Sequence, residues 1–287
     1  MATLREIRHR ISSIKSTQQI TRAMKMVAAA KLRKAQEAIL TTRPYAYRID
    51  EMIRHILVSE EDVQNPLLRV RDVRRVTIVA VTADRGLCGA FNSNIIKKVI
   101  HQIDLHKDKE ISLVCVGRKG YDFFSKRRYP IEKHYIQLFN RLTFSHALEI
   151  ANYLVKSYEK GLTDRIEVVF NQFKNAAQQN LIVETYLPLS AKAFSSRKYG
   201  VDYIYEPDKT TLLHELLPKH LNVQMWRILL ESNAAEQGAR MTAMENATDN
   251  AEELIHDLTL FYNRARQTSI TKEITEIVGG AEALKSA

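Results

Sequence analysis

Residues 244–265 read MENATDNAEELIHDLTLFYNRA, and the spacing of their apolar residues is the strongest structural signal in the chain. Its apolar residues alternate spacings of three and four, which is the heptad pattern of a helix in a coiled coil. These residues are Met244, Ala247, Ala251, Leu254, Leu258, Phe261 and Ala265. The pattern is expected to change phase at the polar residues 267–269 before it resumes at Ile270, Ile274 and Ile277.

The helix around this stretch is predicted to be long. Pro207 and Asp208 form a helix start signal, and Pro218 is expected to bend the first turns. A helix from about residue 209 to 284 would be roughly 110 Å long. No part of the remaining chain is long enough to bury such a helix on all sides.

The N-terminal end carries a second apolar seam. Thr3 and Glu6 have the spacing of a capping box, so a helix can begin there. The seam is expected to run through residues 4–14 and then to change phase after the polar residues 16–19. Its expected members are Leu4, Ile7, Ile11, Ile14, Ile20, Met24 and Val27. Pro44 is predicted to kink or interrupt this helix near Arg43.

Two seams at opposite ends of one chain can bury each other. A homodimeric coil is the alternative, but it would need two separate dimer seams in one chain. We therefore predict an α/β protein with a long antiparallel coiled coil made of its N- and C-terminal helices. The coil would comprise residues 1–60 and 208–287, with a Rossmann-like α/β domain inserted over residues 74–205.

The middle of the chain has the pattern of an α/β domain. Buried-strand runs occur at residues 76–81 and 111–116, with an amphipathic helix between them at 92–103. Thr143 can cap a further helix that ends at Gly161. Two last strands, at 166–173 and 181–187, are joined by a short polar turn. Alternating strands and helices predict a largely parallel sheet, and the short last connection predicts an antiparallel pair.

The turn after the first strand, residues 82–90, lies where a phosphate-binding loop would lie. Its sequence matches neither G-x-G-x-x-G nor a P-loop, so we interpret Gly86 and Gly89 as structural turn residues. Cys88 and Cys115 have no histidine partner at a recognisable spacing, and the nine histidines form no ligand cluster. The sequence therefore predicts no catalytic, cofactor or metal site.

The basic charge of the N-terminal segment fits either a solvated helix face or contact with an acidic partner. Of the formal net charge of +10, most lies in residues 1–36, which contain nine basic residues and one acidic residue. Such a helix suits either nucleic acid or an acidic protein surface. There is no apolar run long enough to cross a membrane and no signal-peptide core, and two cysteines do not make a disulfide framework.

Three motifs in order resemble the gamma subunit family of F-type ATP synthases, over essentially the whole chain. The first is Ile20–Ala29, ITRAMKMVAA. The second is Asp84–Gly89, DRGLCG, followed by Phe91 and Asn92. The third is the C-terminal set of Ala239–Met244, ARMTAM, Asn263–Gln267, NRARQ, and Ile270–Ala281, ITKEITEIVGGA.

This resemblance implies a central rotor shaft that is not an enzyme by itself. The implied partners are the alpha and beta subunits, which form a hexamer and carry the catalysis, the epsilon subunit and the membrane ring of c subunits. The implied role is to couple ion-driven rotation of that ring to conformational change at the beta subunits. Residues expected to contact the hexamer are Arg22, Met24, Lys25, Arg264, Arg266, Gln267, Thr271 and Glu273.

The expected location is the cytoplasmic face of a bacterial cell membrane, as a peripheral protein that meets the membrane only through the c-ring. The alternative function is a basic coiled-coil protein that binds nucleic acid. That alternative predicts aromatic residues among the basic ones, and residues 1–36 contain none. The resemblance therefore favours a protein partner and no nucleic acid.

Overall fold

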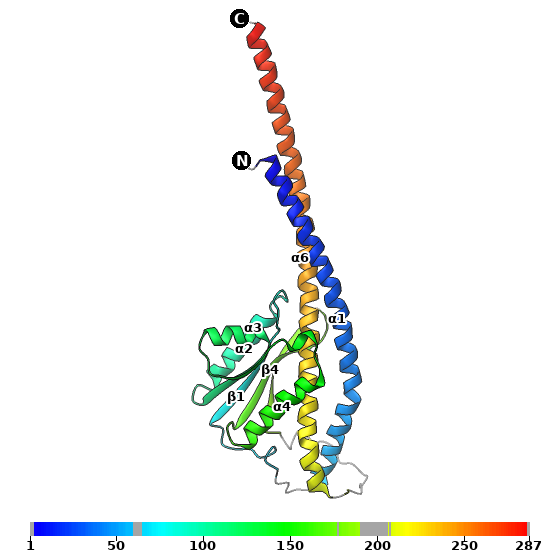
Figure 1. Cartoon of the computed structure of the whole chain (residues 1–287), viewed down its shortest axis with the longest axis vertical. Coiled ribbons are helices and arrows are strands. Elements are labelled where there is room, and N and C mark those ends of the chain that lie inside the picture. The colour runs from blue at the N-terminus through cyan, green and yellow to red at the C-terminus, as the bar shows by residue number, and fades with distance from the viewer. Residues whose placement is uncertain (1–2, 60–64, 177, 190–205, 207, 286–287) are drawn as a thin grey trace. The chain divides into compact units, whose positions relative to one another are not determined.

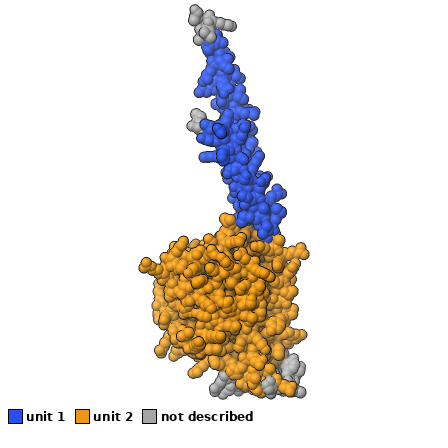
Figure 2. Space-filling model, viewed as in Figure 1, with its two compact units in different colours: residues 1–27, 241–287 blue, residues 28–240 orange. Residues whose placement is uncertain are grey.

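The computed structural model describes residues 3–59, 65–176, 178–189, 206 and 208–285. The chain divides into two compact units, residues 1–27 with 241–287 (unit 1) and residues 28–240 (unit 2) (Figure 2). Two long helices, α1 (Leu4–Ser59) and α6 (Lys209–Lys285), each run through both units. Thr3 and Glu6 form the predicted capping box at the start of α1, with hydrogen bonds of 2.9 and 3.3 Å.

Neither proline interrupts its helix. Pro44 lies inside α1 and Pro218 lies inside α6, so of the predicted kink or interruption near Arg43 the interruption is excluded. A proline costs a helix one hydrogen bond and a steric clash. Packing offsets that cost here, because Ile49 and Ile53 are buried in the main core on the C-terminal side of Pro44.

In unit 1 the two helices pair antiparallel. The side chains of Arg8 and Tyr262 are hydrogen-bonded at one end, and those of Lys25 and Glu245 at the other. On α1 the less exposed positions alternate spacings of three and four without interruption, and they include the polar residues Gln18 and Thr21. These positions are Leu4, Ile7, Ile11, Ile14, Gln18, Thr21 and Lys25, and Met24 beside Lys25 is also half-buried.

The predicted change of phase on α1 is therefore wrong. Ile20 and Val27, expected in the seam, are exposed by 60% and 56%. The seam continues through polar residues because Thr21 meets Thr248 and Lys25 meets Glu245 across the coil. The neighbouring apolar side chains consequently face outward.

The seam of α6 is half as predicted. Met244, Ala251, Leu258 and Ala265 lie in it, but Thr248, Ile255 and Tyr262 each lie one position beyond the expected residue. Leu254 and Phe261 are exposed by 52% and 55%. The seam ends at Ser269, and Ile270, Ile274 and Ile277, which were expected to resume it, are exposed.

Unit 2 is built on a five-stranded sheet of order β3-β2-β1-β4-β5 (Figure 1). Strands β1 (Arg75–Val81), β2 (Glu110–Val116), β3 (Ile131–Tyr135) and β4 (Arg165–Phe173) are parallel, and β5 (Gln179–Leu187) is antiparallel to β4. The predicted parallel sheet with an antiparallel last pair is confirmed. The sequence missed β3, a short edge strand with alternating exposure.

Helices cover both faces of this sheet. Alternate residues of β1 point to opposite faces, so Val76, Ile78 and Ala80 pack with α2 (Phe91–Leu105) and α3 (Arg118–Lys126). Val79 and Val81 pack with α4 (Phe144–Glu159), α1 and α6. A short 3-10 helix, η1 (Leu138–Asn140), precedes α4. The core is therefore two layers of helices around one sheet.

Within unit 2, α6 is enclosed rather than paired along one seam. No residue from 220 to 240 is exposed, and this segment includes polar residues such as Ser232, Glu236 and Gln237. A helix buried on all sides must satisfy its polar side chains internally. This segment of α6 therefore depends on directed bonds to the sheet as well as on apolar packing.

Candidate functional site: the coil surface and the turn after β1

The predicted contact residues of α6 form two groups. All five are exposed. The helical period puts Arg264, Gln267 and Thr271 on one side of α6, because their spacings are three and four. Arg266 and Glu273, seven residues apart, share a different side. The structure therefore presents these residues outward in unit 1, but it does not gather them into one patch.

The predicted contact residues of α1 lie around the seam. Arg22 is exposed, whereas Met24 and Lys25 are half-buried. The ammonium of Lys25 donates to Glu245 across the coil at 2.6 Å. Helical spacing puts Arg22 and Met24 on opposite flanks of the seam. Since Lys25 pairs near residue 245, this group lies about 30 Å along the coil from Arg264.

Polar layers hold the register of the coil. The hydroxyls of Thr21 and Thr248 are 2.7 Å apart, and the ion pair of Lys25 with Glu245 lies one turn away. Arg8 adds a hydrogen bond of 2.8 Å to the hydroxyl of Tyr262. Small apolar layers alone tolerate sliding, whereas a polar pair inside a seam specifies one register. These layers therefore favour a coil that keeps one register along its length.

The coil also exposes many large apolar side chains. On α1 they are Ile20, Met26 and Val27, and on α6 they are Leu254, Leu260, Phe261, Ile270, Ile274, Ile277 and Val278. Within the described chain, α1 provides no turn that could pair with α6 beyond about Ser269, and every residue from 270 to 280 is exposed. Such an apolar surface is typical of a protein that is enclosed by partners.

The turn after β1 is a rigid structure. Leu87 and Gly89 have left-handed backbone conformations, with φ of 63° and 56°, whereas Gly86 does not. The carboxylate of Asp84 accepts backbone N–H groups of Arg118 at 3.0 Å, Gln137 at 2.8 Å and Phe139 at 3.2 Å. Asp84 thus occupies backbone N–H groups that a bound phosphate or other anion would need at this edge of the sheet.

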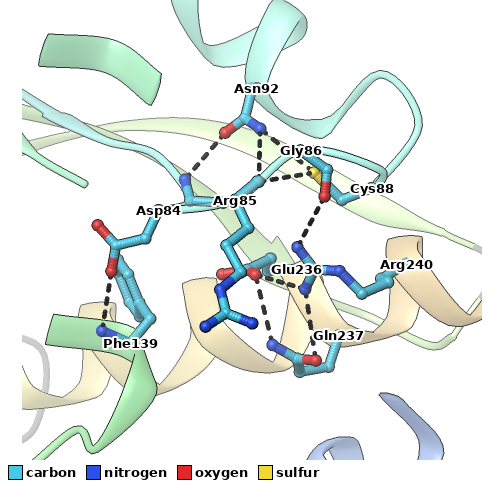
Figure 3. Close-up of polar contacts among 10 residues, drawn as sticks. Asp84, Arg85, Gly86, Cys88, Asn92, Phe139, Glu236, Gln237 and Arg240 are labelled. Carbon is cyan, nitrogen blue, oxygen red and sulfur yellow. Dashed lines mark hydrogen bonds and ion pairs between the residues drawn. The ribbon is translucent and has the colours of Figure 1, made fainter. Parts of the chain in front are cut away.

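Figure 3 shows that this turn is bonded to α6. The Arg240 guanidinium donates to the carbonyl of Gly86 at 3.1 Å and to the carboxylate of Glu236 at 2.5 Å. Burial raises the pKa of Glu236, and Arg240 lowers it without fully offsetting that effect. The sequence offered one signal, the spacing of four between Glu236 and Arg240, but it did not indicate that two motif regions meet here.

The two cysteines are poor nucleophiles. Cys88 and Cys115 are both free and buried. Burial raises the pKa of the Cys88 thiol, and it raises the pKa of Cys115 to about 12. Both groups are therefore protonated at neutral pH, and the thiolate is the reactive form.

The described residues contain no group of three or more His, Cys, Asp or Glu side chains that could hold a metal ion. A search of the same residues finds no helix that is long and apolar enough to cross a membrane.

A two-helix coil with an exposed contact surface, continuous with a Rossmann-like unit, defines the chain as a stalk-type subunit of a larger assembly. Residues 3–284 match the family model described as ATP synthase. The chain is 51% identical to the ATP synthase gamma chain of Chloroherpeton thalassium, with 99% of each chain covered. It is 52% identical to that of Chlorobium phaeobacteroides, covering 99% of this chain and 100% of the relative. The chain belongs to the family of ATP synthase gamma chains.

Solved structures agree with this assignment. The central stalk and c-ring structure of Tetrahymena thermophila mitochondrial ATP synthase contains a similar chain, with 28% identity and a TM-score of 0.62 over 79% of this chain and 99% of that one. A chain of Euglena gracilis mitochondrial ATP synthase, in its OSCP/F1/c-ring structure, has the same fold. Its TM-score is 0.67 at 21% identity, with 98% of this chain and 94% of that one covered.

As a member of this family, the chain is the central rotor shaft of an ATP synthase and not an enzyme by itself. ATP is made and hydrolysed on the beta subunits. The relatives compared are ATP synthase gamma chains, and nothing among these matches supports the nucleic-acid alternative.

Proposed function

We propose that the coil of unit 1 turns inside a hexamer of alpha and beta subunits and makes its contacts through the two predicted groups. One group is Arg22, Met24 and Lys25, and the other is Arg264, Arg266, Gln267, Thr271 and Glu273. The observation that carries this proposal is the outward-facing surface of the coil. Its apolar side chains are too many for a helix pair that stays in water.

Weak contacts suit a part that must rotate. Partly exposed ion pairs contribute only about 0–1 kcal/mol each, so basic side chains on the coil can attract an acidic loop of a beta subunit without locking to it. Lys25 is already paired with Glu245. An acidic loop therefore competes with Glu245 for this ammonium, which weakens that contact further.

The exposed end of α6 suits a sleeve-like bearing. Ile270, Ile274, Ile277 and Val278 are exposed by 47–72% and have no seam to fill. Apolar contacts are non-directional, so they hold an axle laterally while opposing rotation little. We assign this end of α6 to the hydrophobic upper part of the hexamer.

The α/β part of the chain, residues 74–205, would lie outside the hexamer between the two coil segments 1–60 and 208–287. We assign the epsilon subunit and the c-ring as its partners, following the family. The chain would then be a peripheral protein on the cytoplasmic side of the cell membrane, reaching the membrane only through the c-ring.

Reconstitution tests the shaft assignment. The purified chain is mixed with alpha and beta subunits of the same organism, and ATPase activity is measured together with the mass of the complex. We expect activity to appear with one copy of this chain in each hexamer. A folded chain that neither joins the hexamer nor stimulates ATPase activity contradicts the proposal.

The Gln267→Ala variant tests the contact group on α6. Gln267 is exposed and outside the seam, so the substitution should leave the coil folded and lower coupled ATP synthesis severalfold, as expected for a lost hydrogen bond. His256→Ala is the matched control, because His256 is exposed on a similar side of α6 outside the proposed group. Equal synthesis by both variants rules out a contact role for Gln267.

A further inference from the structure

We infer that α6 is locked against rotation about its own axis by two sets of directed bonds to the sheet of unit 2. In the turn link, Arg240, which Glu236 holds from within α6, bonds the carbonyl of Gly86, and the β5 link joins Glu184 to Gln224 and Arg227. Arg240 and Arg227 are therefore positioning residues for torque transfer. This inference rests on the shaft function and names the bonds through which the α/β part drives the helix.

The turn link is buried and specific. Arg240 and Glu236 are exposed by only 9% and 4%, and the guanidinium also lies 3.4 Å from the side-chain oxygen of Gln237. The Arg240 guanidinium thus forms an ion pair with Glu236 and also donates hydrogen bonds to Gln237 and to a backbone carbonyl (Figure 3). A planar fork of donors makes such a bond sensitive to angle, which a lysine cannot reproduce.

The turn itself cannot follow a rotating helix. Asp84 binds it to α3 and to the segment around residues 137–139, and Asn92 accepts the N–H of Ala83 at 2.9 Å. The carbonyl of Gly86 is therefore held by the sheet and its connections. Any rotation of α6 has to break the bond rather than carry the turn along.

A second contact blocks α6 from another side. A Cβ atom on Gly238 would lie 3.2 Å from the carbonyl oxygen of Ala176, between β4 and β5. Gly238 and Arg240 point about 200° apart around the helix because they are two residues apart. The β4–β5 hairpin and the turn after β1 thus hold α6 from nearly opposite directions.

The β5 link lies 13 residues before the turn link on α6. Arg227 donates to both carboxylate oxygens of Glu184 at 2.7 and 2.8 Å, and Gln224 donates to the same carboxylate at 2.6 Å. The hydroxyl of Tyr186 donates to the carbonyl of Leu221 at 2.8 Å. One nitrogen of Arg227, Nη2, makes both bonds to Glu184, so the orientation of α6 at this point is set by Arg227, Gln224 and Tyr186 together rather than by a two-nitrogen fork.

Directed bonds are needed because apolar packing alone permits a helix to turn. A rotation of about 20° moves a group at the helix surface, roughly 5 Å from the axis, by about 2 Å. That displacement breaks a hydrogen bond of 3.1 Å but only rearranges side chains in a core. The two links therefore fix the rotational position of α6 about its own axis against the sheet.

The test uses the complete ATP synthase in inverted vesicles and compares ATP-driven proton pumping with ATP hydrolysis. The variants are Arg240→Lys, Glu184→Gln and their combination. We expect hydrolysis to persist and the ratio of pumping to hydrolysis to fall, most strongly in the combined variant. Lys219→Met is the matched control, since within the described part of the chain Lys219 pairs with Glu215 alone, on the exposed side of α6.

Amide hydrogen exchange separates positioning from stability. Losing one hydrogen bond to a charged group should quicken exchange in the turn 84–89 about tenfold in Arg240→Lys. The swapped variant Glu236→Arg with Arg240→Glu restores an ion pair but places a carboxylate near the Gly86 carbonyl, so it should not rescue coupling. Rescue by the swap, or an unchanged pumping ratio in the combined variant, overturns the inference.

The same experiment distinguishes failure of this inference from failure of the shaft function. If the unmodified chain assembles and pumps while all variants pump equally well, only the role of the two links is excluded. If the unmodified chain neither assembles nor supports hydrolysis, both the shaft function and the role of the two links are excluded.

Discussion

Gly117 is the residue at which the sheet tolerates a side chain least. It has φ of 95°, and an added Cβ would collide with the carbonyl group of Thr82. We predict that Gly117→Ala lowers the free energy of unfolding by about 2–4 kcal/mol through strain and steric overlap. Urea unfolding followed by circular dichroism measures this change.

Gly279→Ala is the control for that substitution. Gly279 lies in α6, and an added Cβ would meet nothing within 4 Å. Alanine should instead favour the local helix by about 1 kcal/mol. A Gly117→Ala variant as stable as Gly279→Ala would contradict the backbone conformation described for Gly117.

Asp164 makes stability depend on pH. Burial raises its pKa, but hydrogen bonds from Arg75 and Arg74 outweigh that effect and hold the pKa below its ordinary value. A depressed carboxyl pKa stabilises the fold above the unfolded-state pKa of about 3.9, and the contribution is lost as the pH falls through the folded-state pKa. We predict that Asp164→Asn costs about 1–3 kcal/mol at pH 7 and flattens the acid limb of the stability curve.

The measurement for Asp164 is the free energy of unfolding from pH 7 down to pH 3. Asp108→Asn is a suitable comparison, since Asp108 is exposed in the turn before β2. Identical acid limbs for Asp164→Asn and the unmodified chain would show that this carboxylate is not linked to folding.

At the scale of elements, the seam of α6 is the feature that most needs testing. Ile255 is half-buried in the coil, whereas Leu254 beside it is 52% exposed. We predict that Ile255→Ala weakens the pairing of α1 with α6 by about 1–2 kcal/mol, part of the cost of emptying a full core site. Leu254→Ala should change it by less than about 0.5 kcal/mol.

Amide exchange of residues 7–21, on the facing helix, reports the strength of this pairing. Faster exchange is expected in Ile255→Ala only. Faster exchange in Leu254→Ala instead would indicate that Leu254, as the apolar pattern alone predicts, and not Ile255 lies in the seam.

Heptad spacing predicted both helices and half of the α6 seam, but it assigned the wrong residues to the other half. Leu254 and Phe261 are more apolar than Thr248 and Ser269, so pattern reading put them inside. Hydrophobicity cannot distinguish the packed side from the outer side when both sides carry large apolar residues. The polar pairs Thr21 with Thr248 and Lys25 with Glu245 form between two helices, so the pattern of either helix alone could not predict them.

The sheet was easier to predict than the coil. Runs such as Val76–Val81 are buried on both faces and therefore continuous in hydrophobicity. The edge strand β3 was missed because Glu132, Lys133 and His134 interrupt any apolar run. The hydrogen bond from Arg240 to the Gly86 carbonyl could not be predicted, since 154 residues separate the two. Every residue has a backbone carbonyl, so the sequence does not indicate which one is bonded.

At the scale of the whole molecule, the basic N-terminal segment should govern assembly. Nine of the first 36 residues are basic and one is acidic. Attraction between opposite charges speeds association, and salt screens it. We predict that the rate of joining the alpha–beta hexamer falls about tenfold between 0.02 and 0.5 M salt.

Stopped-flow fluorescence with labelled chain measures this rate. A variant with Arg5, Arg10 and Lys15 replaced by Gln should associate more slowly at low salt and respond less to added salt, because all three side chains are exposed. A rate independent of ionic strength would mean that charge does not guide assembly.

The exposed isoleucines near the end of α6 also bear on how a cell must make this protein. Ile270, Ile274 and Ile277 are exposed in the chain on its own. An orphan copy would present this surface to chaperones and proteases or to other orphan copies. Under the proposed enclosure by alpha and beta subunits, we expect synthesis in step with those subunits and a short lifetime for excess copies.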